Sequence, residues 1–315
     1  MTKRRTRAIA GAALLALAGA LALSGCSSEA AADSSDADGR LRVTASFYPL
    51  QYIAQRIGGD AVRVASLTRP GAEPHDLELT PRDVAHLQDS DLVVYLSGFQ
   101  PAVDDGIVAA GPPATFDAAP SADLNLTFTP VEQGQAKRNE AGSTDPHFWL
   151  DPTRLSSVAA ALEAEMARLR PADAADFATN LAALRAELDA LDADYRKGLS
   201  QCANPDLVTS HNAFGYLAQR YGLRQVPITG LTPEAEPQPR ELADVIDFVE
   251  ANDVRTIYYE TLVSPAVADT VARETGAAAA VLDPIEGLTA QSAGTSYFEV
   301  MRANLASLRH GQPCR

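Results

Sequence analysis

Three of the five histidines lie in short polar motifs that are far apart along the chain. The motifs are Pro-His75-Asp, Asp-Pro-His147-Phe-Trp-Leu-Asp-Pro and Ser-His211-Asn, and a fourth, Leu-Asp283-Pro, follows an apolar run. Three imidazoles and one carboxylate form a complete tetrahedral ligand set for zinc. Because these residues are dispersed, the whole fold would hold the metal, which would then be a cargo or a catalytic centre.

Each of these residues also has an ordinary structural interpretation. A lone histidine after a strand is more often a capping or core residue than a ligand. Asp before Pro is a common opener of turns, so Asp283 alone says little. The four together are more informative than any one of them. The two remaining histidines, His86 and His310, fall in a predicted helix and in the C-terminal tail, and we expect both at the surface.

Short apolar runs alternate with amphipathic helices in both halves of the chain. The predicted strands are 41–47, 62–67, 92–96, 206–209, 225–228, 256–259 and 278–282, and the predicted helices between and after them are 50–57, 81–87, 102–109, 213–221, 241–251, 265–274 and 297–308. Such alternation predicts parallel sheets covered on both faces. From Pro152 to Ser200 the apolar residues instead follow helical spacing, interrupted at Pro171, with no strand signal.

We therefore predict an α/β fold with two lobes, each a parallel sheet flanked by helices, joined by a long connector helix. The predicted division is an N-terminal lobe at 40–151, a helical connector at 152–200 and a C-terminal lobe at 201–315. Ligands of open parallel sheets bind outside the carboxyl ends of the strands. His75 and His147 lie in loops of the first half, whereas His211 and Asp283 follow strands of the second. Two ligands from each half would place the metal in the cleft between the lobes.

The first 25 residues read as a lipoprotein signal peptide. A basic start precedes an apolar run from Ala8 to Leu23, and Leu-Ser-Gly-Cys26 then resembles a lipobox in which Cys26 would receive the lipid. A plain secretory signal or a single-span anchor is the alternative, although the run is short for a span. Residues 26–39 are rich in Ser, Ala, Asp and Gly and are predicted to form a flexible tether.

Charge and cysteine content narrow the class of protein further. The formal net charge is -15, and it becomes more negative once the basic leader is removed, so the chain lacks the electrostatic footprint of a nucleic-acid-binding protein. Only Cys202 and Cys314 remain after Cys26. In an exported protein an even remainder favours one disulfide, and two free thiols too far apart to bond are the alternative.

The four motifs resemble those of the metal-specific solute-binding proteins that deliver zinc or manganese to ABC importers. The matching segments run from Gly71 to Asp76, from Asp145 to Pro152, from Ser210 to Leu217 and from Leu282 to Pro284. The resemblance covers Arg40 to the C-terminus and includes the order of the motifs and the long connector helix. Many zinc-specific relatives carry a histidine-rich loop before the second motif, whereas residues 131–144 contain no histidine here.

The resemblance implies a lipid-anchored, extracytoplasmic zinc receptor that hands its ion to a membrane permease and has no enzymatic activity. In that family a histidine at the third position is associated with zinc and a carboxylate with manganese, and this chain has His211. Imidazole nitrogens suit zinc, whereas manganese prefers oxygen-rich sites, which agrees with that assignment. Manganese or iron as the cargo is the alternative. We expect a monomer whose partners are the zinc ion, the permease and, through its lipid, the membrane.

Two other classes of protein remain as alternatives. A zinc hydrolase would hold the metal with three histidines and leave the fourth place to water, but no His-Glu-x-x-His or similarly close-spaced motif is present. A surface adhesin could use the same two lobes. For the binding protein, the outer ring nitrogens need acceptors, and Asp76, Asp151 and Glu260 are candidates by position. These three carboxylates could equally be helix caps or surface charges.

Overall fold

The computed structural model describes residues 39–128 and 142–314. The predicted signal peptide, the lipid attachment at Cys26 and residues 26–38 of the predicted tether lie outside the described residues. Most of the histidine-free stretch, residues 131–141, also lies outside them. Within the two described ranges, no helix is both long enough and apolar enough to cross a bilayer.

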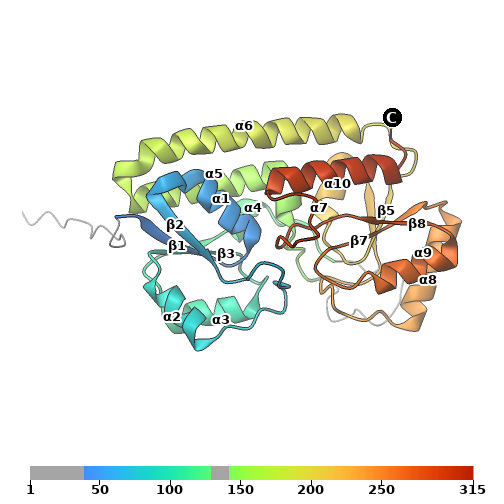
Figure 1. Ribbon diagram of the computed structural model, residues 1–315, viewed down its shortest axis with the longest axis horizontal. Coiled ribbons are helices and arrows are strands. Elements are labelled where there is room, and N and C mark those ends of the chain that lie inside the picture. Colours follow the sequence, from blue (N-terminus) through green and yellow to red (C-terminus); the bar gives the residue numbers. More distant parts are fainter. Residues whose placement is uncertain (1–38, 129–141, 315) are drawn as a thin grey trace, which may run out of the picture. The chain divides into compact units, whose positions relative to one another are not determined.

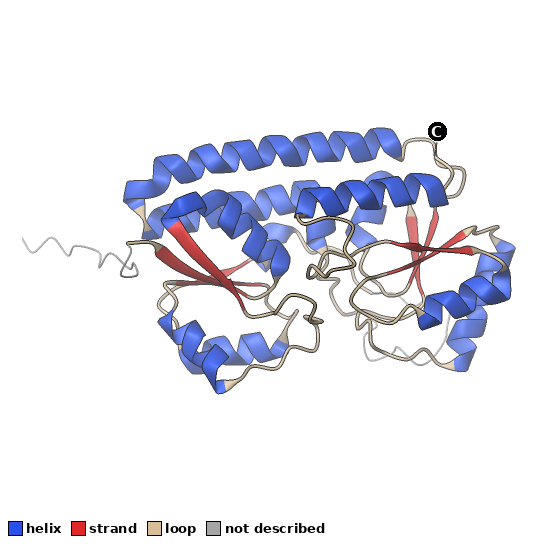
Figure 2. Cartoon of the chain, viewed as in Figure 1, coloured by secondary structure: helices blue, strands red, loops and turns tan. Residues whose placement is uncertain are grey.

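The first half of the chain forms a four-stranded parallel sheet with the strand order β2-β1-β3-β4. Its helices lie on both faces of the sheet, with α1 on one face and α2 and α3 on the other (Figures 1 and 2). The strands are β1 (Leu41–Ala45), β2 (Val62–Ser66), β3 (Leu92–Tyr95) and β4 (Thr115–Asp117), and the helices are α1 (Tyr48–Gly58), α2 (Pro81–Asp89), α3 (Pro101–Ala110) and α4 (Ala119–Ala122).

The second half repeats this topology with four other parallel strands in the order β6-β5-β7-β8. In both sheets the first strand along the chain lies between the second and the third, so the connection from the second strand to the third crosses over the first. The carboxyl ends of the first and third strands therefore lie side by side at the centre of the sheet. The strands are β5 (Asp206–Thr209), β6 (Arg224–Pro227), β7 (Thr256–Tyr259) and β8 (Ala278–Val281), and the helices are α7 (Gly215–Tyr221), α8 (Pro239–Ala251), α9 (Ala266–Thr275) and α10 (Tyr297–Gly311).

Two helices connect the halves, α5 (Pro152–Leu169) and α6 (Ala174–Gly198), and Pro171 lies in the short 3-10 turn between them. Leucines recur along α6 at helical spacing and are buried, which packs the helix along its length. Helix α6 contacts α1 of the first half and α10 of the second, and Figure 1 shows it running alongside both. The predicted fold class, two helix-flanked parallel sheets with a long connector helix, is confirmed. The division at residues 151 and 200 stays a prediction.

The largest hydrophobic cluster includes residues of both halves, so the second half does not pack as an isolated unit. The hydroxyl of Tyr297, at the start of α10, donates to the carbonyl oxygen of Trp149 at 2.6 Å. The ring of Tyr297 also lies 5.7 Å from that of Tyr52 in α1, measured between centroids. The last helix of the chain therefore packs against the first half.

The predicted disulfide between Cys202 and Cys314 is present. Cys202 follows α6 and Cys314 follows α10, so the bridge ties the ends of these two helices together. It joins positions 112 residues apart and closes a loop that contains the entire second sheet.

Replacing Cys202 and Cys314 together by serine should lower the free energy of unfolding by roughly 4–5 kcal/mol, because a long loop is no longer closed in the unfolded chain. Urea denaturation followed by far-UV circular dichroism measures the change. The unchanged protein in reducing agent should lose as much stability as the double variant. A loss below about 1 kcal/mol would contradict the loop-entropy account.

Candidate metal centre

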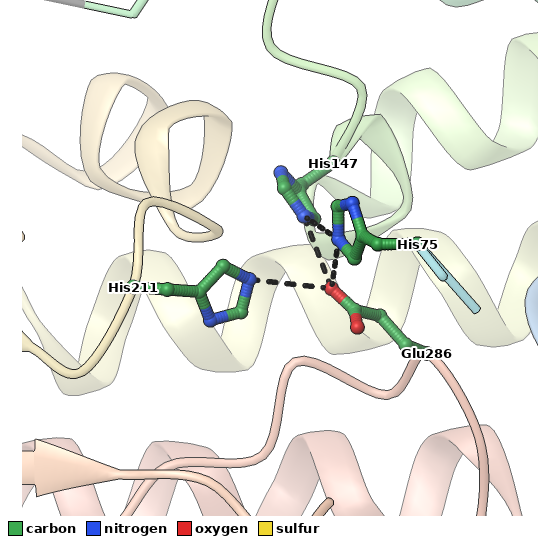
Figure 3. Close-up of side chains that lie close together, drawn as sticks. All are labelled: His75, His147, His211 and Glu286. Atoms are coloured by element: carbon green, nitrogen blue, oxygen red, sulfur yellow. Dashed lines mark hydrogen bonds and ion pairs between the residues drawn. The ribbon is translucent and has the colours of Figure 1, made fainter. Parts of the chain in front are cut away.

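Four side chains from both halves of the chain converge: His75, His147, His211 and Glu286 (Figure 3). Their candidate ligand atoms all lie within 4.8 Å of one another. Glu286 Oε1 lies 3.3 Å from Nε2 of His75, 3.0 Å from Nε2 of His147 and 3.4 Å from Nε2 of His211. One carboxylate oxygen thus faces the same ring nitrogen of all three imidazoles.

His75 reaches the centre from the loop between β2 and α2. Its main-chain N–H donates to Glu73 Oε1 at 3.0 Å. The side chain of Gln100, which precedes α3, donates to the Pro74 carbonyl and to Thr68 Oγ1, both at 3.1 Å. These bonds fix the backbone of a loop rich in Pro and Gly.

His147 immediately precedes the short 3-10 turn Phe148–Leu150 that leads into α5. Asp145 Oδ1 accepts both the main-chain N–H of His147, at 3.0 Å, and its Nδ1, at 2.8 Å. The hydroxyl of Tyr216 in α7 donates to the Asp145 carbonyl at 2.9 Å. Asp145 therefore orients the ring so that Nε2 points to the centre.

His211 follows β5, at the carboxyl end of the strand, as predicted. Its Nδ1 lies 2.7 Å from Glu260 Oε1, and Ser210 Oγ donates to the same oxygen at 2.7 Å. Glu260 itself follows β7, the neighbour of β5 in the sheet. Two adjacent strand ends thus supply one imidazole and the acceptor that orients it.

Glu286 was missed by the sequence analysis, and the structure does not bring Asp283 into the group of four. Asp283 is buried in a turn, where Oδ1 accepts the main-chain N–H of Ile285 at 2.8 Å. Its Oδ2 accepts the hydroxyls of Thr261 and Ser292, at 3.1 and 3.0 Å. The ordinary interpretation of Asp-Pro as a turn opener describes this residue. The sequence signal that could have identified Glu286 is that it is a second acidic residue, three positions after Asp283 in the same loop that follows β8.

Of the three predicted outer carboxylates, only Glu260 contacts a ring of the group. Asp76 is exposed. Asp151 caps α5 by accepting the main-chain N–H of Thr153 at 2.9 Å, and it pairs with Arg154 and Arg220. The acceptor for His147 is instead Asp145, which lies in the quoted motif but was not singled out.

The charges in the group shift one another's pKa values. Burial alone would lower the pKa of His147, but hydrogen bonds to Asp145 and Glu286 outweigh it and raise that pKa. For His211, burial is likewise outweighed, by Glu260 and then Glu286, and the pKa is raised well above its ordinary value. Burial opposes ionisation of Glu286, yet the three imidazoles hold its pKa well below the usual range.

His75 differs from the other two because burial dominates and lowers its pKa. Nearby, burial and the charge of Glu286 raise the pKa of Glu73 to about 9. His75 is also the least buried member, with 10% of its side chain exposed, against 0% for the other three. Among the described residues it lines a cavity of about 820 Å³ together with Phe99, Pro146 and Leu231.

Buried polar atoms remain without partners at the centre. Within the described part of the chain, His211 Nε2 and Glu286 Oε2 have no hydrogen-bond partner, and both are buried. Unsatisfied buried polar atoms are uncommon and call for an explanation such as an ion. Trp149 and Phe99 pack their rings 5.2 and 4.7 Å from those of His147 and His75. The donor set and the unpaired atoms fit a small cation.

The fold and this site define a class of two-lobed α/β protein with three imidazoles and one carboxylate at its centre. The model of the family described as "Zinc-uptake complex component A periplasmic" matches residues 43–311. The chain belongs to this family.

Among curated relatives, the zinc-binding lipoprotein AdcA of Streptococcus pneumoniae is 36% identical over 308 residues. The alignment covers 94% of this chain, but the chain spans only 60% of the length of that relative.

Two solved structures of similar fold align with this chain over almost their whole length. The Zn(II)-bound ZnuA-like domain of Streptococcus pneumoniae AdcA superposes with a TM-score of 0.72 at 33% identity, covering 87% of this chain and 99% of that one. The laminin-binding protein Lbp of Streptococcus pyogenes gives a TM-score of 0.73 at 32% identity, covering 86% and 99%.

Changing Asp145 to Asn should lower the pKa of His147, because a negative charge 2.8 Å from Nδ1 is removed while an oxygen acceptor remains. An NMR titration of the imidazole nitrogens in metal-free protein measures it. Asp151→Asn is the matched control, since it makes the same change on the carboxylate that caps α5 and should leave His147 unaffected. Equal shifts in the two variants would disprove the pairing.

Proposed function

We propose that this protein binds a zinc ion with His75, His147, His211 and Glu286 and delivers it to the membrane permease of an ABC importer. The observation that carries the proposal is the convergence of three imidazole nitrogens on one buried carboxylate oxygen. The chain's membership of a family described as a zinc-uptake component, and the names of its zinc-binding relatives, support the same function.

The composition of the site favours zinc over manganese or iron. Three nitrogen donors and one carboxylate oxygen suit a tetrahedral zinc ion, whereas manganese prefers more numerous oxygen ligands. Asp145 and Glu260 accept from Nδ1 of His147 and His211, which leaves Nε2 of each ring free for the ion. The three imidazoles come from loops far apart in sequence, so the ion would link both halves of the molecule.

The same geometry favours binding over catalysis. A catalytic zinc keeps one position open for water, whereas here the fourth position is taken by the carboxylate of Glu286. We accordingly propose a solute-binding receptor with no enzymatic role. The leader sequence and the lipoprotein relative support an extracytoplasmic location with a lipid on Cys26. We further propose that the protein acts as a monomer and meets the permease at the membrane surface.

Adhesion is the second candidate function, because the similar structure of Streptococcus pyogenes is described as laminin-binding. This candidate rests on the structural similarity to that laminin-binding protein. Binding of the purified protein to immobilised laminin, with and without zinc, distinguishes adhesion from zinc delivery.

Changing His211 to Ala should weaken zinc binding by more than about 100-fold, beyond the 10–100-fold cost typical of losing an outer partner. Competition with a chelating indicator dye measures the affinity. His86→Ala is the matched control, because His86 is an exposed histidine of α2 and its loss should leave the zinc affinity unchanged.

Elemental analysis of the purified protein and a zinc-versus-manganese titration test which metal is bound. Preferential binding of manganese would overturn the assignment of zinc.

Zinc affinity should fall as pH drops through the histidine range. The pKa values of His147 and His211 are raised in the metal-free protein, and an imidazole must lose its proton before it binds a metal. Lower pH therefore favours the protonated, metal-free form. Calorimetry in two buffers of different ionisation enthalpy counts the protons released on binding. An affinity that stayed constant from about pH 8 to about pH 5 would contradict the assignment of histidine ligands.

A further inference from the structure

A strained turn immediately precedes the carboxylate at the centre of the site. Asp283, Pro284 and Ile285 lead from the end of β8 to Glu286. Ile285 has a φ of +59°, in the left-handed region that β-branched residues rarely adopt. Such a conformation persists only where its surroundings enforce it.

Asp283 supplies the main constraint on this turn. It is 1% exposed, and its Oδ1 accepts the N–H of Ile285 at 2.8 Å. The hydroxyls of Thr261 and Ser292 donate to Oδ2 and hold the carboxylate in place. Asn304 of α10 accepts from the Asp283 N–H at 2.9 Å and donates to its carbonyl at 2.7 Å. The side chain and main chain of Asp283 are therefore anchored together.

The first half of the chain holds the same turn from the other side. Trp149 lies two residues after His147 in the chain, and its Nε1 donates to the Pro284 carbonyl at 2.7 Å. Tyr297 in turn bonds the Trp149 carbonyl at 2.6 Å. The loop that carries His147 is thus tied directly to the turn that carries Glu286.

We propose that Asp283 is a positioning residue that locks Ile285 in the left-handed conformation and thereby places Glu286 Oε1 against the three imidazoles. The proposal rests on the proposed zinc site. Ile285 directly precedes Glu286, so a change of its φ and ψ to an ordinary region would redirect the next residue. Glu286 Oε1 lies 3.0–3.4 Å from all three Nε2 atoms, and a redirected side chain would lose this position.

The hydrogen bonds of Asp283 argue against direct ligation of the ion by this residue. Both of its oxygens already accept bonds from the turn and its neighbours. Moving the carboxylate to the ion would leave the N–H of Ile285 without its acceptor, and that is costly in a buried turn.

The test compares Asp283→Ala, Asp283→Asn and Glu286→Gln with the unchanged full chain. The readouts are zinc affinity by chelator competition and the visible absorption of bound cobalt(II), which reports the ligands around the ion. Asp283→Asn keeps an oxygen that can accept from Ile285, so its affinity and spectrum should stay close to those of the unchanged protein. Asp283→Ala should lose at least about tenfold in affinity, the lower end of the range for outer partners. Its cobalt spectrum should approach that of Glu286→Gln.

A second variant separates positioning from a general loss of folding. Ile285→Gly in the Asp283→Ala background should regain part of the affinity, because glycine adopts positive φ without steric cost. Thermal melting of each variant controls for folding. If Asp283→Asn lost as much zinc affinity as Glu286→Gln, Asp283 would be a ligand and the proposal would be overturned. Full zinc affinity in Asp283→Ala would also overturn the proposal. Failure of the unchanged protein to bind either metal would instead overturn the proposed function itself, and this role with it.

Discussion

The centre of the structure depends on one buried negative charge. Glu286 is fully buried, and a buried carboxylate is costly unless opposite charges or hydrogen-bond donors surround it. His75, His147 and His211 meet this requirement from three loops that are distant in sequence. Because two of these loops belong to the first half of the chain and one to the second, the charge couples the two sheets. A divalent cation would satisfy the same carboxylate together with Nε2 of His211, which has no hydrogen-bond partner.

The three imidazoles are not held equally. Asp145 and Glu260 hold the rings of His147 and His211 through Nδ1, whereas His75 is held through its main chain by Glu73. His75 is also the partly exposed member, and it lines the cavity beside the site. The buried side of the centre therefore holds the two imidazoles that are fixed through Nδ1, and the less constrained imidazole of His75 faces the cavity.

Sequence patterns predicted most of the fold but only part of the site. Short apolar runs and helical spacing identified the connector helices and seven of the eight strands in the described part of the chain. The remaining strand, β4, is three residues long and half-exposed, too short to give a pattern. The three histidines were found because their motifs are polar and specific. Asp145 and Glu286 were not, because the choice between two nearby acids depends on how a turn directs its side chains. Spacing identifies the loop, whereas backbone geometry decides which of its acids faces the three imidazoles.

The exchange of roles between Asp283 and Glu286 has a physical explanation. A carboxylate that directly follows a strand is well placed to bond the N–H two residues on, as Asp283 does with Ile285. The left-handed Ile285 costs about 1–3 kcal/mol, and each hydrogen bond of Asp283 returns about 0.5–1.5 kcal/mol. The bonds to Asp283 are numerous enough to offset the strain. A longer side chain three positions later can then reach the three imidazoles while the shorter acid holds the turn.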